Sequence, residues 1–343
     1  MTGSAPLLLL TTAGITLLLA PALALFFGGR PDARRRRAIA VAIPASMALV
    51  TVCWMLLGTE PDVALYQGAL AAAAATVVLS IGLRYGSMRG FCAFVAVWLV
   101  LVVVPVGFSV FDVHNGPLVV AFGTIDYGGA SALALSVGCA AVALPLATHG
   151  RVEPELIHRP PLRLLLSAVA ALAGLLALSV GAELAIDATT LIVALNGLWA
   201  AAAGLAGWLI AQLANVHRAT GAGAVAGLIA GSVSVLPAAP WLDSTSSVVI
   251  GLAAGMLGHV VANAARRGHA GIWATPIAVL YVPAAVGFLG VGLLAHGSGV
   301  VYSGHMTLLT AELTGLLVVT AYALAVSAAI AFAVERLVGL RAR

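Results

Sequence analysis

Long apolar runs separated by short polar gaps make up almost the whole chain. A helix needs about 20 mostly apolar residues to cross the hydrocarbon core of a bilayer. On that measure the pattern predicts membrane-spanning helices at residues 5–27, 38–58, 63–83, 90–110, 120–148, 163–185, 188–213, 221–238, 245–265, 272–295 and 306–334. No basic segment precedes the first run and no well-placed small-residue cleavage site follows it. We therefore interpret that run as a retained span and not as a signal peptide.

The positive charges fall in alternate gaps between these runs. All 16 Lys and Arg positions are arginine, and they follow only the odd-numbered runs. They are Arg30, Arg34, Arg35, Arg36, Arg37, Arg84, Arg89, Arg151, Arg159, Arg163, Arg218, Arg266, Arg267, Arg336, Arg341 and Arg343. Because cytoplasmic loops retain positive charge during insertion, the alternation predicts a multi-pass protein of the cell membrane with its N-terminus outside and its C-terminus in the cytoplasm.

Composition narrows the class of protein further. The chain is 62% hydrophobic and 8% charged, and its mean hydropathy is +1.12. The net charge of +4 does not suggest nucleic acid, because the arginines are spread over six loops or ends where they meet anionic lipid headgroups. The dense basic segment at residues 28–38 is interpreted as a topology anchor, and a cytoplasmic acidic or regulatory protein is the alternative partner.

The order of spans predicts an all-α membrane protein with internal symmetry. The longest polar stretch, residues 149–163, separates five spans from five more, and one span is left over. Two halves of five spans each have opposite orientations, as in many transporters built from inverted repeats. We therefore expect a single membrane domain over residues 1–343, with a first half at 1–148, a second half at 163–295 and a last helix at 306–334.

A few polar residues lie at membrane depth, where an unpaired charge is costly. Asp126 begins the fifth run beside two glycines, so a capping role for its carboxylate is favoured, and direct contact with a cation is the alternative. His259 and Glu312 lie deeper in their runs. For His259 we expect a hydrogen-bonded packing role in preference to a ligand or a proton relay.

Motifs for catalysis, metal binding and disulfides are missing from the sequence. The chain has no lysine and therefore no GxxxxGK loop, and it contains no HExxH. The three cysteines lie inside apolar runs without CxxC spacing. His296 and His305 frame the last outer loop but lack a third ligand, and His114 is interpreted as a solvated loop residue beside Asp112. We expect no enzyme, no cofactor and no metal.

Eight short motifs, in order along nearly the whole chain, resemble the ammonium transporter/Rh family. They include LAPALALFFGG at 19–29, YQGALA at 66–71, GTIDYGGASALALSVG at 123–138 and IAGSVSVLPAAP at 229–240. This resemblance implies a homotrimer of eleven-span channels with a pore in each protomer. It also implies an outer vestibule, a phenylalanine gate and a pair of pore histidines.

The family positions carry different residues in this chain. By resemblance, the vestibule tryptophan falls at Phe111, the vestibule serine at Ala182, and the two gate phenylalanines at Leu70 and Leu178. The two pore histidines fall at Ala134 and Pro283, and only Asp126 keeps its family identity. A cation–π contact at Phe111 remains available. Pro283 also frees a backbone carbonyl near Val279.

These substitutions lead to three hypotheses. The first is a channel that conducts ammonia or another small, mostly neutral solute, because a pore without histidine has no group that binds a proton near neutral pH. The second is a non-conducting sensor or membrane partner of other proteins. The third is a transporter of a larger amine or apolar substrate that the leucine gate admits.

Overall fold

The protein forms a bundle of helices. The structure is a computed structural model that describes residues 5–29, 32–148, 160–267 and 271–341. Four of the arginines named above, Arg30, Arg151, Arg159 and Arg343, lie outside the described residues. Within those ranges the only strand-like feature is an isolated bridge between Gly86 and Arg341, so the predicted all-α class is confirmed.

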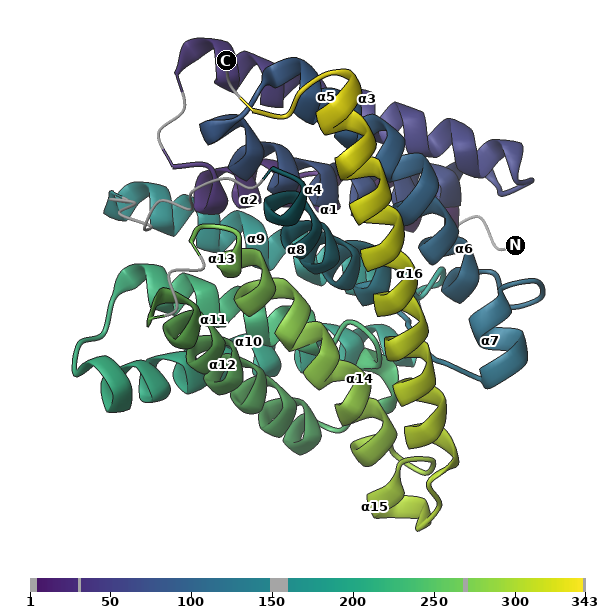
Figure 1. Cartoon of the computed structure of the whole chain (residues 1–343). Helices are drawn as coiled ribbons and strands as arrows, with labels where there is room; N and C mark the ends of the chain where they lie inside the picture. The colour runs from purple at the N-terminus through teal and green to yellow at the C-terminus, as the bar shows by residue number, and fades with distance from the viewer. Residues whose placement is uncertain (1–4, 30–31, 149–159, 268–270, 342–343) are drawn as a thin grey trace.

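The first half of the chain occupies the upper part of Figure 1. Its helices are α1 (Ala5–Thr16), α2 (Leu19–Phe27), α3 (Ala33–Leu56), α4 (Pro61–Tyr85), α5 (Met88–Trp98), α6 (Val104–Phe111), α7 (Pro117–Phe122) and α8 (Ser136–Thr148). Two π-helical turns, η1 (Leu99–Val103) and η2 (Ser131–Leu135), join α5 to α6 and lead into α8.

The second half lies below the first in the same view. It contains α9 (Pro161–Gly181), α10 (Ala188–Val216), α11 (Gly221–Ser234), α12 (Ser244–Arg267), α13 (Ala274–Pro276), α14 (Val282–Leu294) and α15 (Val300–Ser303). A 3-10 turn, η3 (Ala239–Trp241), precedes α12, and a π-helical turn, η4 (Ile277–Tyr281), precedes α14. The chain ends with α16 (Thr307–Leu337).

The described helices account for the predicted spans. Ten of them, counting joined pieces together, are long and apolar enough to cross a membrane, and α11 is a shorter apolar helix at the place of the eighth prediction. The predicted eighth span extends to residue 238, but α11 ends at Ser234 and a turn follows. Hydropathy does not detect that end, because Val235, Leu236 and Ala238 are as apolar as the helix before them and are fully buried.

The predicted start of the fifth span was wrong. The run at 120–148 is mostly apolar, but only 117–122 and 131–148 are assigned to helices. Residues 123–129, here named the vestibule loop, are not helical, and Gly123 and Gly129 within them have positive φ angles of 72° and 74°. A helix does not continue through such a left-handed backbone, which glycine adopts readily.

Helix α16 joins the two halves. It packs against α5 and α8 of the first half and against α14 of the second, and it runs along the front of the bundle in Figure 1. Ser327 Oγ accepts a hydrogen bond from Trp98 Nε1 at 3.0 Å. The Tyr281 hydroxyl lies 3.0 Å from Thr320 Oγ1. These bonds replace the hydrophobic driving force that is absent between helices in lipid.

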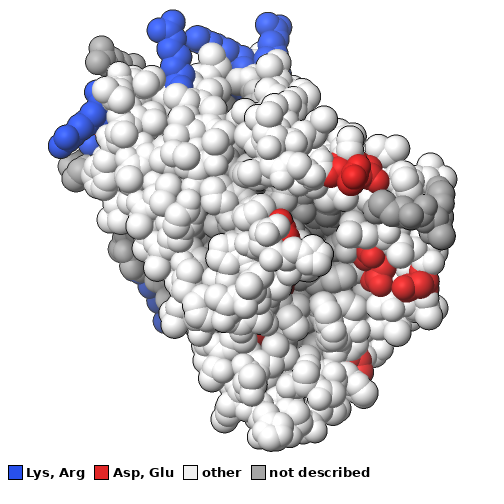
Figure 2. Space-filling view, turned by 90° about the vertical axis from the view of Figure 1, so that its right-hand side faces the viewer, with Lys and Arg blue, Asp and Glu red and all other residues white. Residues whose placement is uncertain are grey.

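The arginine-bearing ends of several helices meet on one side of the bundle. Arg35 Nη1 donates to the Arg84 carbonyl at 3.1 Å, and Arg163 Nε donates to the Leu25 carbonyl at 2.8 Å. The N–H of Ser87 donates to the Leu340 carbonyl at 2.7 Å. Figure 2 shows arginines along its upper and left margins and acidic residues toward the right. The sequence alternation of charge therefore corresponds to a spatial separation of charge.

Candidate functional site

A cavity of about 300 Å³ lies at the start of α4 and the end of α6, away from Arg84 and Arg89 at the opposite ends of these segments, and we name it the vestibule. Its lining residues come from α4, α6, α7, the vestibule loop, the segment after α9, and η3: Val63, Tyr66, Gln67, Val110, Phe111, Val113, Val119, Thr124, Ile125, Asp126, Tyr127, Ala182, Leu184 and Trp241. Three of the residues singled out in the sequence, Phe111, Asp126 and Ala182, therefore line one cavity. Such concave sites are where small ligands usually bind.

The Asp126 carboxylate caps the π-helical turn η2. Its Oδ1 accepts the N–H of Ala130 at 2.8 Å, and its Oδ2 accepts the N–H of Ser131 at 2.8 Å. The Ser131 hydroxyl also donates to Oδ2. Only 3% of Asp126 is exposed, and three hydrogen bonds to a carboxylate satisfy most of its acceptor capacity. This geometry supports the predicted capping role.

The rest of the vestibule loop is held from two other elements. The backbone N–H groups of Tyr127 and Gly128 donate to the carbonyls of Pro237 at 3.0 Å and Leu236 at 2.8 Å. The N–H of Ile125 donates to Glu312 Oε1 at 2.8 Å. The loop thus replaces the helical hydrogen bonds it lacks with bonds to the second half and to α16, as buried backbone requires.

Glu312 is the second buried carboxylate near the vestibule. It lies on α16 and is fully buried, and its Oε2 has no hydrogen-bond partner among the described residues. Thr124 Oγ1 donates to the carbonyl of the preceding residue, Ala311, at 3.1 Å. The sequence indicated only that Glu312 was deep in its helix, because its partner is an apolar residue almost 190 positions away.

Aromatic rings form the walls of the vestibule. Phe111 packs against Trp54, with ring centroids 6.5 Å apart, and Tyr127 packs edge-on against Trp241 at 5.8 Å. The Tyr127 hydroxyl donates to Glu183 Oε2, so Glu183 has a defined partner at the vestibule wall. Tyr127 and Trp241 were not predicted as lining residues, although Tyr127 lies within the motif at 123–138 and Trp241 directly follows the motif at 229–240.

Gly129 brings the vestibule against the buried residues behind it. A Cβ atom at Gly129 would lie 2.5 Å from Phe111 Cζ and 2.8 Å from Leu70 Cδ1. No side chain fits in that space, and the φ angle of 74° also favours glycine. Phe111 of the vestibule and Leu70 of the interior are therefore neighbours across one glycine.

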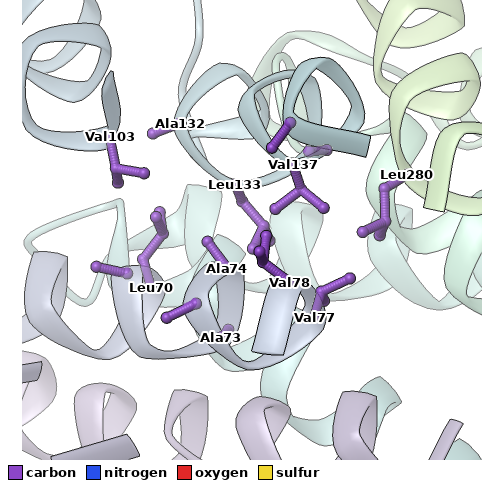
Figure 3. Close-up of a cluster of buried hydrophobic side chains, with 14 of the residues drawn as sticks. Leu70, Ala73, Ala74, Val77, Val78, Val103, Ala132, Leu133, Val137 and Leu280 are labelled. Atoms are coloured by element: carbon purple, nitrogen blue, oxygen red, sulfur yellow. The ribbon is translucent and has the colours of Figure 1, made fainter. Parts of the chain in front are cut away.

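Behind the vestibule, the buried side chains are aliphatic. We give the name apolar floor to the ten residues labelled in Figure 3 together with Leu178 and Ala134. The ten come from α4, η1, η2, α8 and η4: Leu70, Ala73, Ala74, Val77, Val78, Val103, Ala132, Leu133, Val137 and Leu280. All twelve are buried in one cluster. The Tyr66 hydroxyl donates to the Leu178 carbonyl and so ties α4 to α9 at this level.

The two positions that the resemblance matches to pore histidines lie in or beside π-helical turns. Ala134 belongs to η2 and is fully buried. Pro283 is buried in the first turn of α14, directly after η4, where the N–H of Val282 bonds to the Ile277 carbonyl five residues back. η2 and η4 contact each other, and π-helical turns are frequent at functional sites. Val279 lies inside η4, where Pro283 was expected to disturb the hydrogen bonding.

The histidines do not gather into a site among the described residues. His259 is buried, but neither ring nitrogen has a hydrogen-bond partner there. It packs edge-on against Trp208 with centroids 5.7 Å apart, so the expected hydrogen-bonded role was wrong. His114, His296 and His305 are exposed, and the described part of the chain has no group of three metal-ligating side chains.

Two aspartates fix loops at the helix ends opposite the arginines. Hydrogen bonds from the Asn115 backbone and side chain, and from the His114 N–H, lower the pKa of Asp112 below its ordinary value of 3.8. The pKa of Asp243 is lowered in the same way by the Ser246 N–H and by the Tyr302 hydroxyl. The Asp112 carboxylate is held within its own loop by His114 and Asn115, whereas Asp243 also accepts the Tyr302 hydroxyl of α15 at 2.6 Å.

Comparison with known proteins bears on this arrangement. The sequence profile of the Ammonium Transporter Family matches residues 47–343. The chain belongs to the ammonium transporter family. This family member is a multi-pass membrane protein of a class of transporters, not enzymes.

Individual relatives of this ammonium transporter family member are distant. A putative ammonium transporter of Methanothermobacter thermautotrophicus is 25% identical over 402 aligned residues, covering 99% of this chain and 93% of the relative. Ammonium transporter Amt1 of Archaeoglobus fulgidus is 27% identical over 306 residues, covering 81% and 72%.

Solved structures support the fold of this family member. Candida albicans Mep2 superposes with a TM-score of 0.83 at 20% identity and covers 99% of this chain and 86% of that one. A protein described as Sensor Amt Protein superposes with a TM-score of 0.84 at 18% identity, covering 99% and 95%. At these identities the similarity establishes the fold alone.

Proposed function

We propose that the chain is a membrane channel that conducts ammonia or another small, mostly neutral solute through an apolar path in each protomer. The observation that carries this proposal is a vestibule with aromatic walls that adjoins an entirely apolar floor across Gly129. The relatives are named as ammonium transporters, and this supports ammonium as the ion that reaches the vestibule and ammonia as the species that passes.

The chemistry of the floor favours a neutral permeant. Moving a bare charge through an uninterrupted apolar lumen costs several kcal/mol or more. By the family resemblance, Ala134 and Pro283 replace the histidines that would handle a proton, and Leu70 and Leu178 replace the phenylalanine gate. Phe111 offers a cation–π contact of about 0.5–2 kcal/mol in the vestibule, which is enough to concentrate a cation but not to carry it further.

The topology follows the same hypothesis. We place the N-terminus outside and the C-terminus in the cytoplasm, with residues 1–148 and 163–295 as inverted halves and 306–334 as the last helix. The clustering of arginines on one side of the bundle supports this orientation in a cell membrane. Assembly as a homotrimer is proposed from the family resemblance.

The first test is a stopped-flow measurement of internal pH in proteoliposomes after a jump in external ammonium chloride. We expect faster internal alkalinisation than in empty liposomes. Ala182→Trp would obstruct the vestibule it lines and slow the change, whereas Ala188→Trp, at an exposed position outside it, would not. A wild-type trace equal to that of empty liposomes, from protein shown to be folded, would overturn the channel proposal.

A second measurement, of current on a solid-supported membrane, tests whether the floor excludes charge. We expect Ala134→His/Pro283→His to add a current on a solid-supported membrane after an ammonium jump, because imidazoles can take up the proton that ammonia leaves behind. The wild type should alkalinise liposomes without that current. A wild-type current as large as that of the double variant would show that the floor does not exclude charge.

The full burial of Leu70, Leu178 and Ala134 favours a second candidate, a non-conducting sensor or membrane partner of a regulatory protein. This candidate predicts ammonium binding at the vestibule without flux. Quenching of Trp54 and Trp241 fluorescence by ammonium or methylammonium, in protein that conducts nothing, would support it over the channel.

A further inference from the structure

A second cavity lies far from the vestibule, on the face formed by α3 and α5. It has a volume of about 740 Å³, and α4 contributes Leu79 to its base. Arg34 and Arg37 lie at one end, and Leu49 and Leu99 lie at the other. We name it the α3–α5 groove.

The groove follows one face of α3 and is lined there mostly by small residues. Its α3 lining recurs every three or four positions from Arg34 to Leu49, which is one face of a helix, and it includes four alanines. Fifteen residues of helix correspond to roughly 22 Å. Since the hydrocarbon core is about 30 Å thick, the groove extends from the arginine-bearing side past the middle of the membrane.

The charge of the groove is concentrated at one end. Arg34 and Arg37 are exposed, and the lining residues include no carboxylate. The nearest acidic residue in the sequence, Asp32, accepts the N–H of Arg35 at 2.8 Å and lies 3.6 Å from that residue's guanidinium. Guanidinium groups match phosphate oxygens in geometry, and beyond them the lining is almost entirely apolar.

We propose that the α3–α5 groove binds a phospholipid with an anionic headgroup. The phosphate lies against Arg34 and Arg37, and one acyl chain follows α3 toward Leu49. The lipid belongs to the leaflet on the arginine-bearing side, where juxtamembrane arginines attract anionic headgroups. This site is independent of the proposed conduction through the vestibule.

Charge complementarity favours a lipid over a second copy of the chain. A second copy would have to present carboxylates at the level of Arg34 and Arg37. Of the described acidic residues on that side, Asp32 is paired with Arg35. Glu335 is paired with Arg341 at 3.1 Å and accepts the Leu340 N–H at 2.6 Å. A phospholipid supplies the anion and the apolar chain in one molecule.

The test compares two lipids that differ only in headgroup. Purified protein in detergent is titrated with phosphatidylglycerol or phosphatidylcholine of the same acyl chains, and binding is followed by native mass spectrometry. We expect phosphatidylglycerol to bind at least fivefold more tightly. Arg34→Gln/Arg37→Gln should remove that preference, whereas Arg266→Gln/Arg267→Gln, which removes two arginines from the end of α12, should keep it.

Two further experiments test whether the lipid lies in the groove. Ala42→Phe fills the groove without changing its charge, so it should abolish tight binding of phosphatidylglycerol. Cys92 lines the groove and is exposed, and its alkylation should slow at least threefold with phosphatidylglycerol, unlike that of Cys53. Equal binding of both lipids, retained preference in the arginine variant, or a change of oligomeric mass in the Ala42→Phe protein would overturn the proposal, the last in favour of a second copy.

Discussion

The vestibule loop and the apolar floor adjoin each other, yet they are built in opposite ways. The backbone of the loop is held by specific polar contacts: Asp126 accepts three hydrogen bonds, and Glu312 accepts one from Ile125. In the floor, α4, η1, η2 and η4 meet through methyl and methylene groups alone. A loop at membrane depth must satisfy its own backbone, whereas a floor made of helices has no such need.

This difference clarifies the role of Asp126. Because both oxygens of Asp126 are occupied by N–H and O–H groups of the next turn, the carboxylate is committed to holding the loop. A cation in the vestibule would therefore meet aromatic rings before it met a free carboxylate.

The largest expected effect is at Gly129, where the two regions meet. Gly129→Ala adds a left-handed backbone cost of about 1–2 kcal/mol and an overpacking cost of about 1–3 kcal/mol against Phe111 and Leu70. We expect destabilisation of about 3 kcal/mol, measured by tryptophan fluorescence melting in detergent. Gly123→Ala, with a similar φ but open space around its Cβ, should cost about 1 kcal/mol. Equal losses in the two variants would refute close packing at Gly129.

Leu70→Ala tests whether the floor is packed and whether it limits flux. The side chain is 1% exposed, and a cavity of this kind typically costs about 3 kcal/mol. Leu317→Ala is the control, because Leu317 is 66% exposed on α16 and faces lipid, so it should cost under about 1 kcal/mol. Ammonium-driven alkalinisation by Leu70→Ala should be faster than wild type if Leu70 narrows the path. A stability loss no larger than that of Leu317→Ala would mean that the floor is loosely packed.

Asp126→Ala removes the support of the vestibule loop. It leaves the N–H groups of Ala130 and Ser131 without their acceptor, and we expect a loss of about 2–3 kcal/mol in the free energy of unfolding. Asp187→Ala, at the exposed N-cap of α10, should lose only about 1 kcal/mol. An Asp126→Ala protein that remains as stable as wild type and fully functional would show that the structural role is wrong.

Glu312 gives a smaller and more selective effect. Glu312→Leu removes the acceptor of the Ile125 N–H and should cost about 2 kcal/mol. Glu312→Gln keeps an oxygen acceptor at that position, so we expect melting close to that of wild type. Equal melting temperatures for Glu312→Leu and Glu312→Gln would show that the hydrogen bond from Ile125 contributes nothing to stability.

The smallest effect concerns pH and the outer mouth. The pKa of Asp243 is lowered by its hydrogen bonds from Ser246 and Tyr302, so the folded state binds a proton less readily than the unfolded state. Its contribution is therefore present above the ordinary value of 3.8 and is lost as pH falls through the lowered pKa. The melting-temperature difference between wild type and Asp243→Asn should shrink as pH is lowered from 6 to 3. A difference that grew toward acid pH would contradict this sign.

The sequence predicted the class of fold well, because the signals for it are local. Each apolar run is long enough to cross the bilayer, and each arginine lies in a gap between runs, so both signals can be read from neighbouring residues alone. The start of the fifth helix was predicted 11 residues too early, at 120 in place of 131, because hydropathy does not distinguish an apolar loop from an apolar helix. Two positive-φ glycines and a capping carboxylate decide that boundary.

The site was only partly accessible to the same reasoning. Phe111, Ala182 and Asp126 were selected by resemblance, and they line one cavity. Tyr127, Trp241 and the contact of Glu312 with Ile125 were not predicted, because they join segments that are far apart in the chain. His259 was expected to be hydrogen-bonded, but its neighbour across the helix interface is the ring of Trp208.

By itself, then, the sequence determined that this is an all-α membrane protein of many spans, since the cost of exposing polar backbone or charge to lipid acts on every residue independently. Tertiary structure decided that both oxygens of Asp126 accept hydrogen bonds and that Gly129 separates the vestibule from the floor. It also decided that Arg34 and Arg37 lie at one end of the α3–α5 groove. Those features depend on distances between helices, and helix packing in lipid is set by close contacts and hydrogen bonds between distant residues.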